Sequence, residues 1–155
     1  MTENFLRLVS VVTGWVGDRS LDSGLASALT EAFPPGGELF EDLAGECKAG
    51  MKDRWLGQFG DAARRWGRVL DPGERTAGFS VDVVLLDSSK GPVHTHLTGE
   101  IDMIIPVDDG AQFDARSRGW LVYGPGTSHQ PTATGGRVII LYLLPKGLIS
   151  FSGAE

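Results

Sequence analysis

The sequence predicts a mainly β fold preceded by helices, with the β part forming a small antiparallel barrel or sandwich. Two observations predict this fold class. Up to about residue 56, apolar residues recur with the 3.6-residue period of helices. From Trp66 onward, short Val- and Leu-rich runs alternate with turn signals at regular intervals. The 155 residues are most simply one domain, 1–155, with a helical segment at 1–58 and a barrel at 64–155.

Three helices are expected in the first segment. Residues 3–16 carry an amphipathic apolar stripe, and Thr2 is a candidate N-cap. A second helix is expected over 21–33, where a Pro-Pro-Gly-Gly run stops it. A third is expected from about 38 to 56, with Cys47 on its apolar stripe as a core residue.

The β part is divided by turns such as Asp71-Pro72-Gly73 and Gly124-Pro125-Gly126. No repeat of solenoid length and no linker is present, so the helices are expected to pack on the barrel. Strands are expected where β-branched, Leu and aromatic residues run between turns, at 66–70, 79–86, 101–107, 111–113, 120–123, 137–144 and 148–151.

The overall composition excludes several classes of function. A net charge of -6 without a Lys/Arg cluster argues against a nucleic-acid partner. A single cysteine allows no intramolecular disulfide and favours a reducing, cytoplasmic location. The N-terminus lacks the pattern of a signal peptide. No run approaches the roughly 18 apolar residues of a membrane span, so no membrane partner is expected.

All three histidines lie in the β part. His94 and His96 are two apart, so an extended strand places both imidazoles on one face. Gly99 allows a bend that brings Glu100 back toward that face. Two imidazoles and a carboxylate form most of a first-row metal site with open positions. His129 follows a strand and a Gly-Pro-Gly turn, which can place a third imidazole at the barrel mouth.

Two segments resemble the cupin motifs. Residues 91–100 resemble the first, a glycine followed by His-x-His-x-x-x-Glu, and residues 119–129 resemble the second. The second match is imperfect, because Pro125 stands immediately before Gly126 instead of two residues before it. The resemblance implies a cupin-type double-stranded β-barrel, or jelly roll. It also implies a divalent metal held by His94, His96, Glu100 and His129.

These ligand types suit Fe, Mn, Zn, Ni, Co or Cu and do not choose among them. A cupin whose pocket works without metal is the alternative. Homodimers are expected by analogy, since cupins are often dimers.

A closer resemblance extends over nearly the whole chain. The runs Gly78-Phe-Ser-Val-Asp-Val-Val, Gly99-Glu-Ile-Asp102 and Leu141-Tyr-Leu-Leu-Pro145 resemble the 4-hydroxylaminobenzoate lyase family. That family is associated with converting 4-hydroxylaminobenzoate to protocatechuate (3,4-dihydroxybenzoate) and ammonia in bacterial nitroaromatic degradation. Two alternatives stay open. One is another metal-dependent cupin enzyme, a dioxygenase or isomerase, acting on a small aromatic or organic acid. The other is a non-catalytic cupin that binds a small ligand.

The implied reaction must break an N–O bond and replace the ring nitrogen by water, so a Lewis acid and a proton-transfer group would help. Asp102 shares the strand parity of Glu100 and is expected to point inward as a catalytic carboxylate. Its alternative role is structural, bonded to a backbone amide or an arginine. Asp82 is a second candidate unless it points outward. Tyr123, near the third histidine, is expected to donate a hydrogen bond to the substrate.

A benzoate substrate also needs a cation and an apolar wall. A guanidinium matches a carboxylate best, and Arg68 and Arg137 both lie in or beside expected strands. Either arginine can reach the barrel interior, or it can stay exposed at a strand edge. Trp120, together with Phe79 and Met103, would line a pocket for the ring unless these residues only fill the core.

Overall fold

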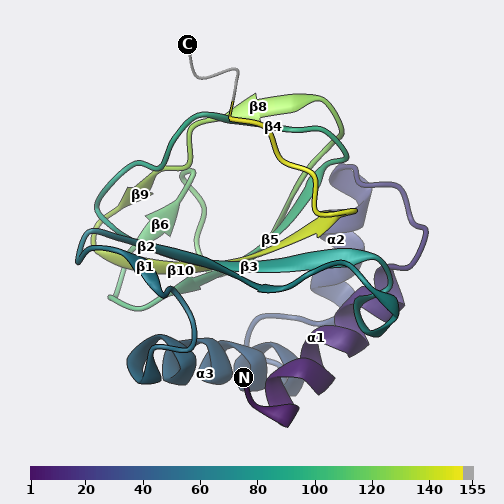
Figure 1. Ribbon diagram of the computed structural model, residues 1–155, viewed down its shortest axis with the longest axis horizontal. Helices are drawn as coiled ribbons and strands as arrows, with labels where there is room; N and C mark the ends of the chain where they lie inside the picture. The colour runs from purple at the N-terminus through teal and green to yellow at the C-terminus, as the bar shows by residue number, and fades with distance from the viewer. Residues whose placement is uncertain (152–155) are drawn as a thin grey trace.

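The computed structural model describes residues 1–151, in which three helices precede a strand-rich part (Figure 1). The helices are α1 (Glu3–Val16), α2 (Ser23–Ala32) and α3 (Glu38–Asp53). Thr2 caps α1 as predicted, because its hydroxyl accepts a hydrogen bond from the Phe5 amide at 3.0 Å. The second helix starts later than expected, since the Asp22 carboxylate caps it by accepting from the Leu25 amide.

Ten strands follow within residues 1–151: β1 (Phe59–Gly60), β2 (Arg64–Leu70), β3 (Phe79–Asp87), β4 (His94–His96), β5 (Glu100–Pro106), β6 (Gln112–Phe113), β7 (Gly119–Tyr123), β8 (Thr127–His129), β9 (Ala133–Thr134) and β10 (Arg137–Pro145). Six of them form one antiparallel sheet in the order β1-β2-β3-β10-β5-β7. Two small antiparallel sheets, β4-β8 and β6-β9, complete the barrel. The prediction of a cupin-type double-stranded barrel with N-terminal helices is confirmed.

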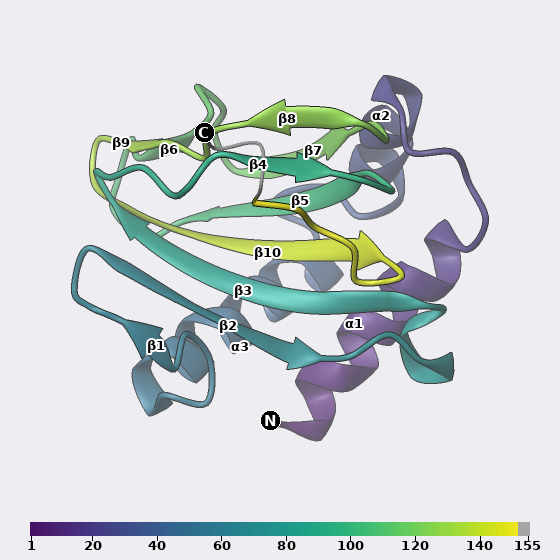
Figure 2. The same ribbon diagram turned by 45° about the horizontal axis from the view of Figure 1, so that its top comes forward.

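The three layers are seen in Figures 1 and 2, where α1 and α3 cover one face of the large sheet and β4-β8 lies across the other. The expected strand at 148–151 is wrong. Only Ser150 in that stretch forms a bridge, to Thr95, and the chain there runs along β4 without a regular ladder. The two-residue strands β1 and β9 were not expected, because neither has an apolar run to mark it.

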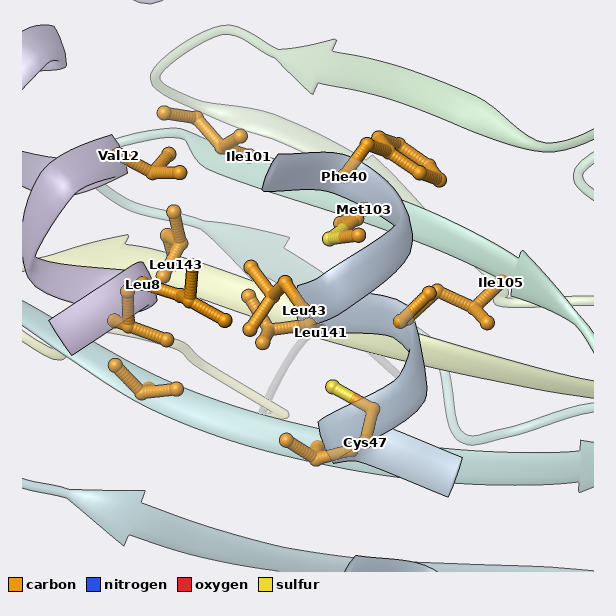
Figure 3. Packing of buried hydrophobic residues seen from close by; sticks show 14 of the residues in the cluster. Leu8, Val12, Phe40, Leu43, Cys47, Ile101, Met103, Ile105, Leu141 and Leu143 are labelled. Atoms are coloured by element: carbon orange, nitrogen blue, oxygen red, sulfur yellow. The ribbon is translucent and has the colours of Figure 1, made fainter. Parts of the chain in front are cut away.

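One face of the large sheet packs on the helices. Cys47 is fully buried there, as expected, and burial raises the pKa of its thiol. The side chains that meet in this layer come from the three helices and from β3, β5, β7 and β10. Figure 3 labels ten of them: Leu8, Val12, Phe40, Leu43, Cys47, Ile101, Met103, Ile105, Leu141 and Leu143.

The opposite face of the sheet lines the barrel interior. Because side chains alternate along a strand, Ile101 and Met103 of β5 face the helices while Glu100 and Asp102 face inward. The apolar part of the interior is a second cluster that includes Leu86, Ile104, Phe113, Leu121, Ile140 and Tyr142. No helix within residues 1–151 is long and apolar enough to cross a membrane.

Candidate metal centre

The four residues expected to bind a metal converge at one end of the barrel. In the β4-β8 pair His94 lies opposite His129, and the Nε2 atoms of these two residues are 3.1 Å apart. The Nε2 atoms of His94 and His96 are 2.9 Å apart. Glu100, at the start of β5, places its Oε2 atom 3.2 Å from Nε2 of His96 and 3.7 Å from Nε2 of His129. All four ligand atoms lie within 4.8 Å of one another.

Gly99 makes the bend that brings Glu100 to this end, as the sequence predicted. Its φ is +91°, in the region that favours glycine. A Cβ atom at this position would lie 2.9 Å from the carbonyl oxygen of Tyr123 and 2.8 Å from the Leu21 side chain. The turn between β4 and β5 therefore needs a residue without a side chain.

The outer ring nitrogens of two histidines are held by oxygen atoms. Nδ1 of His94 donates to the Pro92 carbonyl at 3.2 Å. Nδ1 of His96 lies 3.0 Å from the hydroxyl of Thr127. That hydroxyl donates its own hydrogen to the Gly124 carbonyl at 2.6 Å, so it accepts from His96. Both imidazoles are thereby fixed as the tautomer whose Nε2 lone pair faces the centre.

The third histidine is held by Asp114, which the sequence reasoning missed. Its Oδ2 atom accepts from Nδ1 of His129 and from the Tyr123 hydroxyl, both at 2.6 Å. Its Oδ1 atom accepts from the Thr132 amide at 2.9 Å. Burial acts to raise the pKa of Asp114, but these hydrogen bonds outweigh burial and lower it. A charged carboxylate thus orients the His129 ring.

Glu100 supplies the test of whether a metal fits. The residue is 1% exposed, and neither carboxylate oxygen has a hydrogen-bond partner within residues 1–151. Burial by itself raises the pKa of Glu100, and a positive charge on the neighbouring imidazoles lowers it. A buried, ionised carboxylate facing three nitrogen lone pairs is costly unless a cation neutralises it. The donor set therefore fits a divalent transition metal.

Asp102 lies inside the barrel, two residues along β5 from Glu100. It is fully buried, and neither of its oxygens has a partner in the part of the chain that the structure describes. Burial and the nearby charge of Glu100 raise the pKa of Asp102 well above its ordinary value. Neither a backbone amide nor an arginine within residues 1–151 binds it, so the structural alternative has no support.

A cavity of about 580 Å³ opens beside the metal centre, a usual size for a small-ligand site. Arg68 borders it and donates to Oδ1 of Asp82 at 3.0 Å and to the Gly147 carbonyl at 3.1 Å. Asp82 points inward, and its burial raises its pKa more than Arg68 lowers it. The other residues around the cavity include Arg64, Trp66, Val84, Leu86, His94, Glu100, Tyr142, Leu144, Ile149 and Phe151.

Five expected substrate contacts lie elsewhere or are engaged. Trp120 is opposite Met103 in the β5-β7 pair, so it faces the helices, and its indole N–H donates to the Phe33 carbonyl at 2.9 Å. Phe79 and Met103 belong to the same helix-side core.

Arg137 lies at the exposed end of β10, where it binds both carboxylate oxygens of Asp108, at 3.0 and 2.8 Å. It does not border the cavity. The hydroxyl of Tyr123 donates to Asp114 and so is not free for a substrate, although its ring stacks on His96 at 5.0 Å.

Replacing Asp114 by Asn should weaken metal retention by about 10–100-fold, because His129 would lose its charged orienting partner. The measurement is a competition for the metal against a chelator of known affinity. Asp108→Asn is the matched control, since that carboxylate is paired with Arg137 at the surface and should retain wild-type affinity. Equal affinity in Asp114→Asn and wild type would show that this carboxylate does not orient the ligand.

A family model and two relatives with the same description match this chain. The model of the family described as PnbB, 4-hydroxylaminobenzoate lyase, matches residues 7–151. A 4-hydroxylaminobenzoate lyase of Nocardioides sp. (strain LMS-CY) is 35% identical over 145 residues, covering 86% of this chain and 85% of the relative. One from Pseudomonas putida is 27% identical over 153 residues, covering 88% and 87%.

Among solved structures, a cupin 2 domain-containing protein from Halorhodospira halophila is 17% identical. It matches with a TM-score of 0.42 over 60% of this chain and 71% of that one.

Proposed function

Because this chain belongs to the 4-hydroxylaminobenzoate lyase family, we propose that it converts 4-hydroxylaminobenzoate to protocatechuate and ammonia. The equation balances with one water and no oxidant or reductant. The N–O bond breaks, the ring carbon that carried nitrogen and its neighbour each end with a hydroxyl, and the nitrogen leaves as ammonia. The observation that carries the proposal is the convergence of three Nε2 atoms and a buried carboxylate on a cavity bordered by guanidinium groups.

In this proposal the metal is held by the three Nε2 atoms and the carboxylate already described. A bound divalent ion would supply a Lewis acid that polarises the hydroxylamine oxygen. The ligands themselves are held in place by hydrogen bonds to their Nδ1 atoms. The partners of these atoms are Pro92, Thr127 and Asp114.

The substrate carboxylate would bind at the β2 wall of the cavity. Arg64 and Arg68 are on the same face of β2, with Trp66 between them, and all three border the cavity. The guanidinium of Arg64 makes one hydrogen bond within residues 1–151, to the Lys90 carbonyl at 3.1 Å, so further N–H groups are available to a carboxylate.

The β2 wall and Glu100 lie on different strands of the large sheet. From β2 to β5 the order is β2-β3-β10-β5, which separates the two backbones by roughly 14 Å at the usual strand spacing. Arg64 and Arg68 of β2 and Glu100 of β5 border the same cavity from strands three positions apart in the sheet. A benzoate held by its carboxylate would thus present its 4-substituent to the metal centre.

We keep Asp102 as the proposed proton-handling carboxylate because it lies beside Glu100, although Asp102 does not itself border the cavity. It shares the inward face of β5 with Glu100, is fully buried, and has no partner in the described part of the chain. Tyr123 takes a different place in the proposal, since its hydroxyl helps to hold Asp114 and through it His129. Asp114 and Tyr123 are accordingly positioning residues.

The test is a turnover assay with protein loaded separately with Fe, Mn, Co, Ni or Zn and with metal-free protein as control. At least one loaded form should release ammonia and protocatechuate in a one-to-one ratio from 4-hydroxylaminobenzoate. Failure of every form to do so would refute the substrate assignment. Oxygen uptake that requires Fe, in place of ammonia release, would indicate a dioxygenase.

A further inference from the structure

Tyr142 borders the cavity but has no role so far. It lies in β10, opposite Asp102 of β5 and opposite Asp82 of β3. Its side chain faces the barrel interior, is 7% exposed, and borders the same cavity as His94 and Glu100. A sequence pattern does not mark this residue, because it stands in the most apolar strand of the chain, where a tyrosine resembles any other core residue.

The hydroxyl of Tyr142 is uncommitted. Within residues 1–151 it makes no hydrogen bond, and the one aromatic contact of its ring is edge-to-face with Phe113, at 6.4 Å. Tyr123, the other tyrosine, instead gives its hydroxyl to Asp114. Buried tyrosine hydroxyls normally have a partner. A hydroxyl that borders a cavity without a protein partner is available to a ligand.

The register places Tyr142 near the metal centre, and its side chain borders the same cavity as His94 and Glu100. Side chains directly opposite on an antiparallel pair have Cβ atoms about 4.5–5.5 Å apart, and diagonal neighbours are about 7–8 Å apart, within reach of an aromatic ring. Tyr142 is directly opposite Asp102 and therefore diagonal to Glu100. A phenol is protonated at neutral pH, so this hydroxyl can act as a hydrogen-bond donor.

We propose that Tyr142 is a catalytic residue whose hydroxyl donates a hydrogen bond to the hydroxylamine oxygen of the substrate at the end of the cavity bordered by His94 and Glu100. This inference rests on the proposed function. As the N–O bond breaks, negative charge grows on that oxygen, and a neutral donor fixed in a buried cavity stabilises it more than it stabilises the ground state. The backbone of the rigid central strand β10 holds the donor in place.

The first test is Tyr142→Phe, which removes only the hydroxyl and keeps the contact with Phe113. We expect kcat to fall by about 100-fold, with a much smaller change in KM and unchanged metal content. Tyr123→Phe is the matched variant. It should weaken metal retention, because its hydroxyl binds Asp114, and this contrast separates a substrate contact from a contact that supports a ligand.

The second test measures binding without turnover. Calorimetry would compare 4-hydroxybenzoate, whose 4-substituent carries oxygen, with benzoate, which lacks it. Tyr142→Phe should bind 4-hydroxybenzoate about 10-fold more weakly than wild type and should bind benzoate equally well.

A failure of this inference can be distinguished from a failure of the proposed function. A wild type that does not turn over 4-hydroxylaminobenzoate refutes the proposed function, yet a binding loss confined to 4-hydroxybenzoate would still support the contact with Tyr142. Wild-type kcat in Tyr142→Phe, equal effects on both acids, or no binding of either acid by wild type would each overturn the inference.

Discussion

Replacing His96 by Ala should abolish metal retention and lower kcat/KM by at least about 1000-fold, equivalent to about 4 kcal/mol of transition-state stabilisation. His96 is 0% exposed, and its Nε2 atom lies 2.9 Å from that of His94 and 3.2 Å from Oε2 of Glu100. Its loss removes one of the three imidazole ligands. The measurements are elemental analysis after loading and dialysis, and steady-state kinetics.

The matched control is Thr95→Val. Thr95 lies between the two histidines of β4, and its hydroxyl bonds to that of Ser128 at 2.7 Å, away from the metal centre. This variant should keep metal and activity, which would show that a change in β4 is not damaging by itself. Circular dichroism checks that both variants are folded. Wild-type activity in His96→Ala would mean that the metal takes no part in the reaction.

Removing both guanidinium groups of the β2 wall, in the double variant Arg64→Met and Arg68→Met, should lower kcat/KM for 4-hydroxylaminobenzoate by about 10–100-fold, mainly through KM. A hydrogen bond to a charged group contributes about 1.5–3 kcal/mol, which sets this range. Methionine keeps much of the apolar stem of each arginine, so the change is chiefly one of charge. The measurement is initial rate against substrate concentration.

Two controls separate carboxylate binding from general damage, since Arg68 also binds Asp82 and the Gly147 carbonyl. For an arylhydroxylamine with a methyl group in place of the carboxylate, wild type and the double variant should have the same kcat/KM. Arg137→Met should leave KM unchanged, because Arg137 binds Asp108 at the surface. If the double variant kept the wild-type KM for the acid, the β2 wall could not be the site that binds the carboxylate.

Features that depend on local period were predictable from the sequence. The helical stripe after Thr2, the shared face of His94 and His96, and the inward parity of Asp102 all follow from the 3.6- and 2-residue periods of helix and strand. Gly99 was predictable because only a residue with φ above zero makes so tight a bend before the next strand.

Features that depend on register and long-range contact were not predictable. Trp120 faces the helices because β7 pairs with β5 in the register that sets it opposite Met103, which no local pattern of β7 reveals. Asp114 takes φ of 48° in a loop and reaches His129, 15 residues away. Tyr142 is recognisable as a cavity residue only once β10 is known to lie between β3 and β5.

Long-range contact also explains why the expected strand at 148–151 is wrong. Residues 148–151 are apolar enough to suggest a strand, but the neighbouring strand β4 is only three residues long. A single bridge from Ser150 to Thr95 is what that geometry allows. Phe151 then lies against the His94 ring, with the ring centres 5.7 Å apart, and borders the cavity. The composition of residues 148–151 suggested a strand, whereas the structure makes Phe151 part of the cavity wall.

The metal centre itself is tested most directly by X-ray absorption spectroscopy on protein loaded with a single first-row metal, combined with elemental analysis. We predict one ion per chain, with nitrogen and oxygen scatterers in the first shell and the multiple-scattering pattern of three imidazoles. Metal content no higher than that of His96→Ala, or a shell with fewer than three imidazoles, would contradict the centre formed by His94, His96, Glu100 and His129.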